Sequence, residues 1–257
     1  MKVTDYIVEF LQRKGIHDFF GYQGTMIAHL VDSIEKNPHT RSHSSYHEQG
    51  AAFAACGYAQ AGERCACAYA TSGPGAANLI SGIADAYFDS LPVVFLTGQL
   101  NTYEYSGIPG LRQQGFQEID IAGVVMPITK HSFIVKNVHE LADTIRRAFK
   151  IAQSGRPGPV LVDITKDVTA NVADYEPKAP EPIERVTKTI RAEDIDTAIK
   201  MIENSKKPMI LVGGGVVAAD ASKELKKFAE KIDAVVCDTL MGKGAFPGTD
   251  DRYTGMI

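Results

Sequence analysis

The chain has 257 residues, of which 44% are hydrophobic and 23% are charged, so it is long enough for one large domain or for one domain and part of a second. Its net charge of −4 comes without any basic run, which argues against a nucleic-acid partner and against an anionic membrane surface. No apolar stretch reaches the length of a membrane span, and residues 1–5 lack the apolar core of a signal peptide, so we expect a cytoplasmic protein.

Helical stripes alternate with short apolar runs along the first two thirds of the chain. Helices are predicted where apolar residues recur with a period near 3.6, at residues 3–14, 26–34 and 139–154. Strands are predicted from short apolar runs at residues 18–21, 66–71, 93–97 and 160–164. This alternation predicts an α/β fold with a mainly parallel sheet flanked by helices.

Segment 45–59 is rich in Ala and Gly, which predicts a helix that packs closely against its neighbours. Glu48 lies in the first turn of this helix, beside the positive end of the helix dipole. A carboxylate held between packed elements can share a proton with a nitrogen of a ligand. The alternative is an acid that only offsets the dipole, and the segment alone leaves both interpretations open.

A glycine-rich turn at residues 70–78 follows a predicted strand, and Ser72 is placed to cap the helix after it. Backbone amides at a helix start attract anions, so a phosphate-binding loop is one interpretation. However, the turn does not match the G-x-x-x-x-G-K-[ST] pattern, and no Lys follows it. A turn with a purely structural role remains the alternative.

Two groups of side chains raise the question of a metal site. Cys65 and Cys67 alternate on a predicted strand, but no second pair accompanies them, so we expect buried thiols. His39, His43 and His47 follow one another at intervals of four residues, although a proline and a serine-rich stretch argue against one continuous helix there. The H-E-x-x-H zinc pattern that begins at His47 lacks its second His. We therefore expect no metal ligand in this chain.

A family resemblance is carried by several stretches in a fixed order, namely segment 45–59, the turn at 70–78, segment 83–92, Thr97-Gly98-Gln99, and Gly115-Phe116-Gln117-Glu118. In this order and spacing the chain resembles the N-terminal, pyrimidine-binding domain of thiamine-diphosphate enzymes. The group that it resembles most is that of the acetolactate synthases. The resemblance runs from about residue 6 to residue 168 and continues more weakly to the end.

The resemblance implies roles for the residues that match the family's motifs. Glu48 hydrogen-bonds N1′ of the aminopyrimidine ring, and the activated cofactor then attacks a 2-oxo acid such as pyruvate. The implied catalytic residues are Glu48 and Gln117. The implied cofactor-binding residues are Gln23, Gly24, Glu48, Thr71, Pro74 and Asn78. The implied substrate-contacting residues are Thr25, Phe116 and Gln117.

Three features depart from the family pattern. Gln23 stands where the family usually has Pro, and Thr25 stands where acetolactate synthases usually have a second Gly. The loop at residues 101–114, which includes Tyr105 and Gly107, is longer than we expect in ordinary acetolactate synthases. A different thiamine-diphosphate reaction therefore remains an alternative, either simple decarboxylation or acetyl transfer involving sulfoacetaldehyde.

The domain organisation follows from composition and from the resemblance. We expect a pyrimidine-binding domain at residues 1–170, a proline-containing linker at 171–189, and the start of a Rossmann-like central domain at 190–257. The turn at residues 213–218 fits G-x-G-x-x-A, with Asp233 about 20 residues on, as in a weak dinucleotide fingerprint. Some members of the resembled family hold FAD in this domain and others hold nothing, so FAD is a candidate ligand.

The sequence contains no Gly-Asp-Gly, the motif with which the family's third domain binds Mg²⁺ and the diphosphate. We therefore expect a fragment or half of an enzyme that is inactive alone and needs a C-terminal domain. The resemblance implies a homodimer or tetramer and a carboligase or lyase that acts on pyruvate to form acetolactate or a related ketol. A non-catalytic assembly module that requires a partner chain is the alternative from another functional class.

Overall fold

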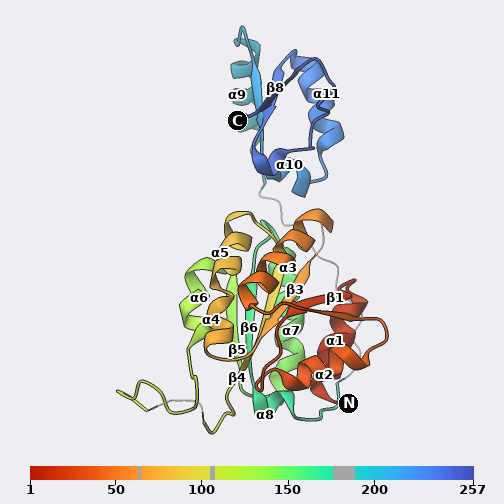
Figure 1. Cartoon of the computed structure of the whole chain (residues 1–257). Coiled ribbons are helices and arrows are strands. Elements are labelled where there is room, and N and C mark those ends of the chain that lie inside the picture. Colours follow the sequence, from red (N-terminus) through yellow and green to blue (C-terminus); the bar gives the residue numbers. More distant parts are fainter. Residues whose placement is uncertain (63–64, 105–107, 176–188) are drawn as a thin grey trace. The chain divides into compact units, whose positions relative to one another are not determined.

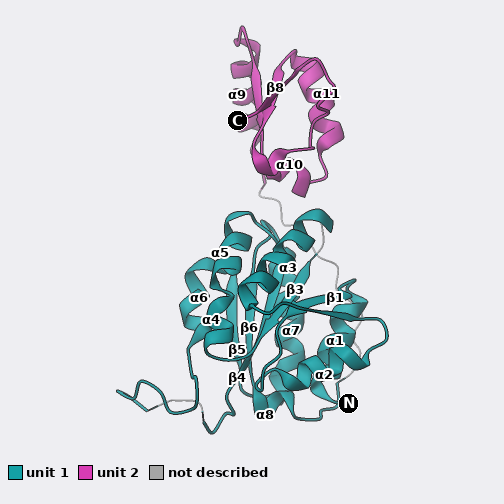
Figure 2. Cartoon of the chain, viewed as in Figure 1, with its two compact units in different colours: residues 1–186 teal, residues 187–257 magenta. Residues whose placement is uncertain are grey.

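The computed structural model describes residues 1–62, 65–104, 108–175 and 189–257. The chain forms two compact units, residues 1–186 and 187–257 (Figure 2). The linker expected at residues 171–189 lies largely outside the described residues, and so do Tyr105 and Gly107 of the expected loop. Each unit has its own sheet and its own hydrophobic core.

The first unit is built on a six-stranded sheet in the order β2-β1-β3-β4-β6-β5, in which every neighbouring pair is parallel (Figure 1). Its strands are β1 (Asp18–Gly21), β2 (Arg41–Ser44), β3 (Ala66–Ala70), β4 (Val93–Gln99), β5 (His131–Val135) and β6 (Val160–Thr165). The predicted parallel α/β fold is confirmed. All four strands predicted from apolar runs are present, and β4 continues through Gln99.

Helices cover both faces of this sheet. The helices are α1 (Val3–Arg13), α2 (Ala28–Lys36), α3 (Glu48–Gly62), α4 (Pro74–Asn78), α5 (Ile80–Phe88), α6 (Ile121–Val125), the 3-10 helix η1 (Met126–Ile128), α7 (Val138–Gln153) and α8 (Lys166–Thr169). Helices α1, α2 and α7 contribute to one apolar cluster, and α3 to α6 contribute to a second one. Parallel sheets need this double cover because both of their faces are apolar.

Strand β3 shows why the two clusters lie on opposite faces. Cys67 and Tyr69 belong to the first cluster, whereas Ala66, Ala68 and Ala70 belong to the second. Successive side chains of a strand point to opposite faces, so one continuous apolar run supplies both layers. Cys65 and Cys67 are buried and free, as expected, and so are Cys56 and Cys237.

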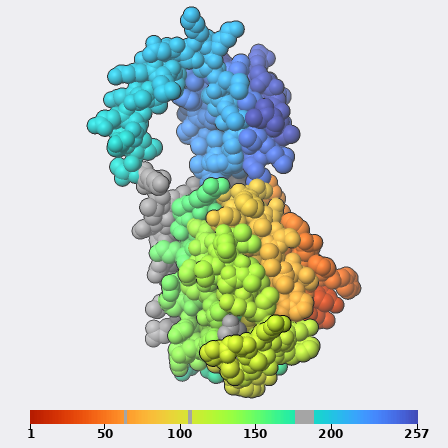
Figure 3. Space-filling model, turned by 90° about the vertical axis from the view of Figure 1, so that its left-hand side faces the viewer, coloured from red at the N-terminus to blue at the C-terminus, as the bar shows by residue number. Residues whose placement is uncertain are grey.

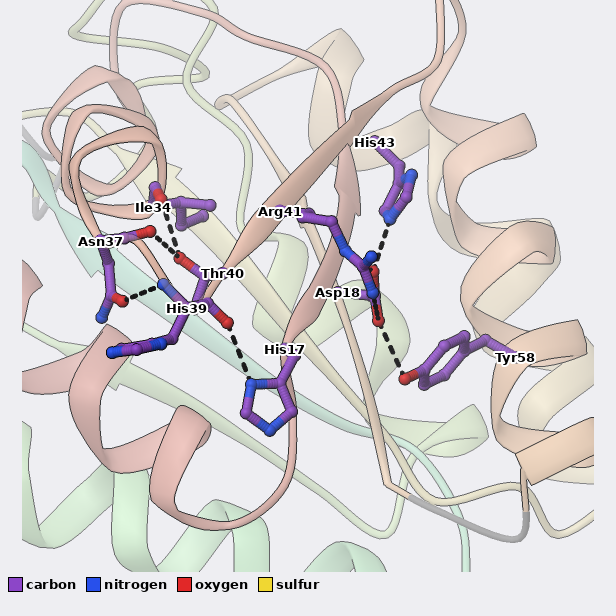
Figure 4. Close-up of polar contacts among 9 residues, drawn as sticks. All are labelled: His17, Asp18, Ile34, Asn37, His39, Thr40, Arg41, His43 and Tyr58. Carbon is purple, nitrogen blue, oxygen red and sulfur yellow. Dashed lines mark hydrogen bonds and ion pairs between the residues drawn. The ribbon is translucent and has the colours of Figure 1, made fainter.

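Strand β2 is held at the sheet edge by polar contacts, since it has no apolar side chain. Asp18 accepts hydrogen bonds from Arg41 at 2.9 and 3.2 Å and from Tyr58 of α3 at 3.0 Å, and it lies 2.7 Å from Nε2 of His43 (Figure 4). Burial raises the pKa of Asp18, but the hydrogen bonds from His43, Arg41 and Tyr58 outweigh it, so the net pKa is lowered. The sequence did not predict this strand, because apolar alternation was the signal used.

The second unit has a three-stranded sheet in the order β7-β8-β9, with both pairs parallel. Its elements are α9 (Ala192–Glu203), β7 (Met209–Val212), α10 (Gly214–Ala218), α11 (Ser222–Ile232), β8 (Val235–Asp238), the 3-10 helix η2 (Leu240–Gly242) and β9 (Tyr253–Met256). Its core is small and includes Val212, Val236 and Phe246. Among the described residues of the whole chain, no helix is both long and apolar enough to cross a membrane.

Candidate active site at the carboxyl edge of the sheet

The candidate site lies where the strand order reverses. Strand β2 follows β1 in the sequence and pairs with one side of it, at the edge of the sheet. Strand β3 comes next in the sequence and pairs with the other side of β1. The elements that follow β1 and β3 therefore lie on opposite faces: α2 belongs to the first apolar cluster and α4 to the second. In open α/β sheets, ligands bind in the crevice outside the carboxyl ends of the strands at such a switch point.

The loops after β1 and β3 touch each other at this switch point. Oγ1 of Thr71 accepts a hydrogen bond of 3.3 Å from the backbone N–H of Met26. A Cβ on Gly24 would lie 2.5 Å from Cβ of Thr71, so only glycine permits this approach. Gln23 and Thr25 flank Gly24 and are both exposed. The structure thus brings these three predicted residues to one edge of the crevice, beside Thr71.

Glu48 is the first residue of α3, and its side chain is only 9% exposed. Its Oε2 accepts a hydrogen bond of 2.9 Å from the amide nitrogen of Asn78, at the end of α4. Within the described part of the chain, no hydrogen bond reaches Oε1 and no cation pairs with the carboxylate. A Cβ on Gly75 would lie 3.1 Å from Oε1. One oxygen is therefore oriented by Asn78, and the other, beside Gly75, keeps its capacity to accept a hydrogen bond.

Gln117 reaches the glycine turn from a distant part of the chain. A Cβ added to Gly73 would collide with the backbone carbonyl oxygen of Gln117. Both residues have left-handed backbone conformations, with φ of 61° at Gly73 and 57° at Gln117. Gly73 is also the N-cap residue of α4, and no side chain caps this helix, so the expected capping role of Ser72 is wrong.

Comparison with known proteins follows the same division of the chain. The pattern of the family described as "Thiamine pyrophosphate enzyme, N-terminal TPP binding domain" matches residues 1–124, and that of the family's central domain matches residues 195–257. The chain belongs to the thiamine pyrophosphate enzymes. Thiamine pyrophosphate is thiamine diphosphate, so the family resemblance noted in the sequence is confirmed.

Similar members of this family include acetolactate synthases. The chain is 43% identical over 252 residues to the acetolactate synthase large subunit of Corynebacterium glutamicum, which covers 97% of this chain and 39% of the relative. It is 42% identical over 263 residues to a probable acetolactate synthase large subunit of Methanocaldococcus jannaschii, covering 100% of this chain and 43% of the relative. It is 39% identical over 260 residues to chloroplastic acetolactate synthase 1 of Zea mays, in an alignment that covers 100% of this chain and 40% of the relative. The chain spans about two fifths of the length of these relatives.

The residues of the crevice fit the aminopyrimidine part of the cofactor that gives the thiamine pyrophosphate enzymes their name. A ring nitrogen that carries a proton needs an acceptor, and Oε1 of Glu48 is an acceptor that the protein leaves available. Gly24 and Gly75 let the two turns pack closely against Thr71, and Gly75 also lies beside Oε1 of Glu48. Pro74 is exposed at the first position of α4 and borders the same turn.

The side chains assigned to the substrate lie less enclosed than those assigned to the cofactor. Phe116 is 74% exposed, and Gln117 and Thr25 are also exposed. Both Phe116 and Gln117 lie between β4 and α6. Part of the described chain in this stretch stands out from the body of the unit in Figure 1 and faces the viewer in Figure 3. The beginning of that stretch is tied to α8, since the N–H of Thr102 donates to Asp167 at 3.0 Å.

The histidines do not form a metal site. His43 lies against Asp18, and Nδ1 of His47 accepts from the N–H of Gln49 at 3.2 Å. Nδ1 of His17 lies 3.0 Å from the carbonyl oxygen of His39. Among the residues that the structure describes, no group of three or more His, Cys, Asp or Glu side chains is placed to hold a metal ion.

The glycine turn of the second unit does not assemble a dinucleotide site from the described residues. Asp233 takes the left-handed C-cap position of α11 and precedes β8, whereas the fingerprint acid follows its strand. Asp238 ends β8, but it is 1% exposed and accepts hydrogen bonds of 3.0 and 3.1 Å from Tyr253. Met241 fills the space beside Gly214.

Sequence reasoning missed one group of polar residues near the site. Asp163 of β6 is 1% exposed, and it accepts hydrogen bonds from Thr97 at 2.6 Å and from Gln99 at 2.8 Å. Burial raises the pKa of Asp163 to about 7, against the opposing effect of the hydrogen bonds from Thr97 and Gln99. The available signal was a single acid inside the apolar run of residues 160–164.

Proposed function

We propose that this chain is the N-terminal part of an acetolactate synthase-like enzyme, a thiamine-diphosphate-dependent 2-oxo acid decarboxylase and carboligase. The substrate would be pyruvate, and the product acetolactate or a related ketol. The observation that carries the proposal is the carboxylate of Glu48, buried at the switch point with one oxygen held by Asn78 and the other available. The similarity to acetolactate synthases over the whole chain supports the choice of reaction.

Glu48 and Asn78 would have different roles in binding the pyrimidine ring. Asn78 donates to Oε2 of Glu48, which orients the carboxylate. Oε1 would then be available to accept a hydrogen bond from a protonated nitrogen of the ring. When bound, the cofactor would supply a nucleophilic carbon and an electron sink for the loss of carbon dioxide. Gln23, Gly24, Thr71 and Pro74 would border the ring.

The substrate would enter from the side of the crevice that carries the exposed residues. Thr25 follows Gly24, which packs against Thr71 of the glycine-rich turn. The backbone of Gln117 packs against Gly73 of the same turn. Thr25, Phe116 and the amide of Gln117 would therefore contact the substrate, with Gln117 able to hydrogen-bond an oxygen of the 2-oxo acid. We propose these roles for the complete site.

The Mg²⁺ and diphosphate contacts would come from residues outside these 257, because the sequence contains no Gly-Asp-Gly. The chain alone would then not turn over pyruvate. FAD is not part of the proposal, since the described residues of the second unit do not form a fingerprint-type site. A related decarboxylase or acyltransferase reaction is the second candidate, favoured by Gln23 and Thr25, which depart from the acetolactate synthase pattern.

A second copy of the chain would complete the assembly. Helices α3 and α5 lie side by side, since Gln49 donates to Ser81 at 2.9 Å. Phe53 of α3 is 45% exposed and Phe88 of α5 is 69% exposed. Phe53 is one turn beyond Gln49 and Phe88 is two turns beyond Ser81, so these aromatic rings share the outer face of the helix pair. We propose that this face is buried in a homodimer, or in a tetramer built from such dimers.

The proposal is tested with the full-length protein that contains this chain. We expect Glu48→Gln to lower pyruvate turnover by about 10² to 10⁴, the usual contribution of one side chain to proton transfer, while circular dichroism and Tm stay unchanged. Glu35→Gln is the matched control, because Glu35 is an exposed glutamate of α2. Near-normal turnover by the Glu48 variant would refute the assignment.

Calorimetric titration of thiamine diphosphate and Mg²⁺ separates the remaining alternatives. We expect tight binding by the full-length protein and weak binding by the 257-residue chain. Equally tight binding by both would contradict the placement of the diphosphate contacts outside this chain. Absence of binding in both would favour the non-catalytic assembly module that requires a partner chain.

A further inference from the structure

A buried polar network joins strands β4 and β6 near their carboxyl ends. Asp163 is paired in register with Thr97, and both residues, like Gln99, have at most 1% of their surface exposed. A buried carboxylate is costly unless its oxygens are hydrogen-bonded. Thr97 donates to Oδ1 of Asp163 at 2.6 Å, and Gln99 donates to Oδ2 at 2.8 Å. The network therefore fixes the side chain of Gln99 inside the sheet.

Gln99 connects this network to the backbone of Ile119, which lies outside the sheet. Its Nε2 also donates to the carbonyl oxygen of Ile119 at 2.9 Å, and its Oε1 accepts from the N–H of Leu100 at 3.0 Å. Both amide hydrogens and the amide oxygen are thus engaged. The contact with Ile119 is the step that joins the buried carboxylate to the segment at residues 115–120.

That segment holds Gln117 in an unfavourable conformation. The φ of Gln117 is 57°, and non-glycine residues stay in this region only when their surroundings fix them. Gly73 restrains Gln117 from one side, and the link from Gln99 to Ile119 restrains the chain two residues further on. Glu118 also accepts hydrogen bonds from the N–H groups of Gln114 and Gly115, at 2.6 and 3.0 Å.

We propose that Gln99, oriented by Asp163, is a positioning residue for Gln117 and Phe116. It holds the carbonyl of Ile119, and so it fixes the backbone that carries Phe116 and Gln117 beside Gly73. The effect on turnover rests on the proposed function. The effect on the conformation of residues 115–120 does not depend on the proposed function. The two effects are measured separately.

Thr97 supplies the matched control. Thr97→Val and Gln99→Met each remove one hydrogen bond to Asp163, but only Gln99→Met also removes the hydrogen bond to Ile119. Gln99→Leu is the second variant if the Met variant fails to fold. Asp163→Asn adds a further test, because the Asn oxygen can still accept from Gln99 while its amide group donates to the hydroxyl of Thr97.

The structural experiment is hydrogen exchange by mass spectrometry on peptides that cover residues 113–120, in the full-length protein. We expect Gln99→Met to raise the exchange rate there at least about tenfold, whereas Thr97→Val and Asp163→Asn leave it near the parent rate. A Phe116→Trp background gives a second reading, since residues 1–257 contain no Trp and residue 116 is exposed. Acrylamide quenching of the fluorescence that this substitution adds, taken as the difference from the protein with Phe116, should increase with Gln99→Met alone.

Parent-like exchange and quenching in the Gln99 variant would overturn the proposal, and so would equal changes in the Gln99 and Thr97 variants. Steady-state kinetics are measured in the protein that keeps Phe116. We expect Gln99→Met to lower kcat roughly 10²-fold, because a misplacement of about 1 Å near the reacting atoms can cost that much. If exchange rises as expected but even the parent protein does not turn over pyruvate, the proposed function fails and the positioning role stands.

Discussion

The proposed chemistry depends on a difference between the two oxygens of one residue. Oε2 of Glu48 is engaged by Asn78, and within the described residues Oε1 is not engaged. A glutamate that only offset the dipole of α3 would have no need of this burial, because exposed acids interact with a helix N-terminus equally well. The burial of Glu48 supports the proposed ligand-binding role, which the sequence left open beside the electrostatic one.

Asp163 gives a second prediction about a single residue, which concerns how the stability of the protein depends on pH. Its pKa is raised from 3.8 to about 7, so between these values the folded protein holds a proton that the unfolded chain has released. The contribution of Asp163 to stability is fully present below about pH 4 and is lost as the pH rises to about 7. At about 1.36 kcal/mol per pKa unit, the loss amounts to roughly 4 kcal/mol.

The measurement is urea unfolding of parent and Asp163→Asn proteins from pH 4 to pH 8. The variant does not titrate at this position, so its free energy of unfolding should rise relative to the parent across that interval. The nearby charges of Asp120 and Lys136 act on Asp163 in opposite directions and are shared by both proteins. A difference between the two proteins that stays constant with pH would show that Asp163 has an ordinary pKa.

At the scale of elements, the start of α4 and the segment at residues 115–120 meet at two left-handed residues. We predict that Gly73→Ala destabilises the protein by about 1–3 kcal/mol more than Gly15→Ala and displaces Gln117. Both glycines have positive φ, 61° and 85°, so both variants strain the backbone. Only at Gly73 would the new Cβ also collide with the backbone of Gln117, because nothing lies within 4 Å at Gly15.

Thermal unfolding of the two variants, with hydrogen exchange of residues 113–120, checks this prediction. Exchange should increase in Gly73→Ala and stay unchanged in Gly15→Ala. If the two variants lose the same stability and exchange alike, then the contact between Gly73 and Gln117 does not restrain the segment.

The elements themselves show where sequence patterns succeed. Short apolar runs predicted β1 and β3, and β3 shows the reason, because a strand buried on both faces needs apolar side chains at successive positions. This signal missed β2, whose four residues are Arg, Ser, His and Ser. This edge strand depends on Asp18, and a partner from a different strand cannot be read from local composition.

At the scale of the whole molecule, the proposed dimer gives a further prediction. Phe53→Asp should weaken association at least about tenfold, because an interface aromatic typically contributes more than 1 kcal/mol and a buried charge adds a desolvation cost. Phe228→Asp in α11 is the control, since Phe228 has a similar exposure of 42%, against 45% for Phe53. Sedimentation equilibrium of the full-length protein measures both.

Equal association of the parent and the Phe53 variant would place the dimer interface elsewhere on the molecule. An equal loss in both variants would point to a general effect of introducing the charge, and the α3 and α5 face would no longer be supported as the interface.

The sequence by itself determined the parallel α/β fold, a helix in segment 45–59 with Glu48 in its first turn, and the family, because these depend on apolar periodicity and on motifs in a fixed order. The tertiary structure decided how the site is assembled. Glu48 meets Asn78, and Gly73 meets Gln117, only because parallel strands bring loops 30 to 44 residues apart to one edge of the sheet. The link from Asp163 through Gln99 to Ile119 spans more than 60 residues for the same reason. Local patterns carry no information about such pairings, since the free energy that stabilises them arises only when the sheet forms.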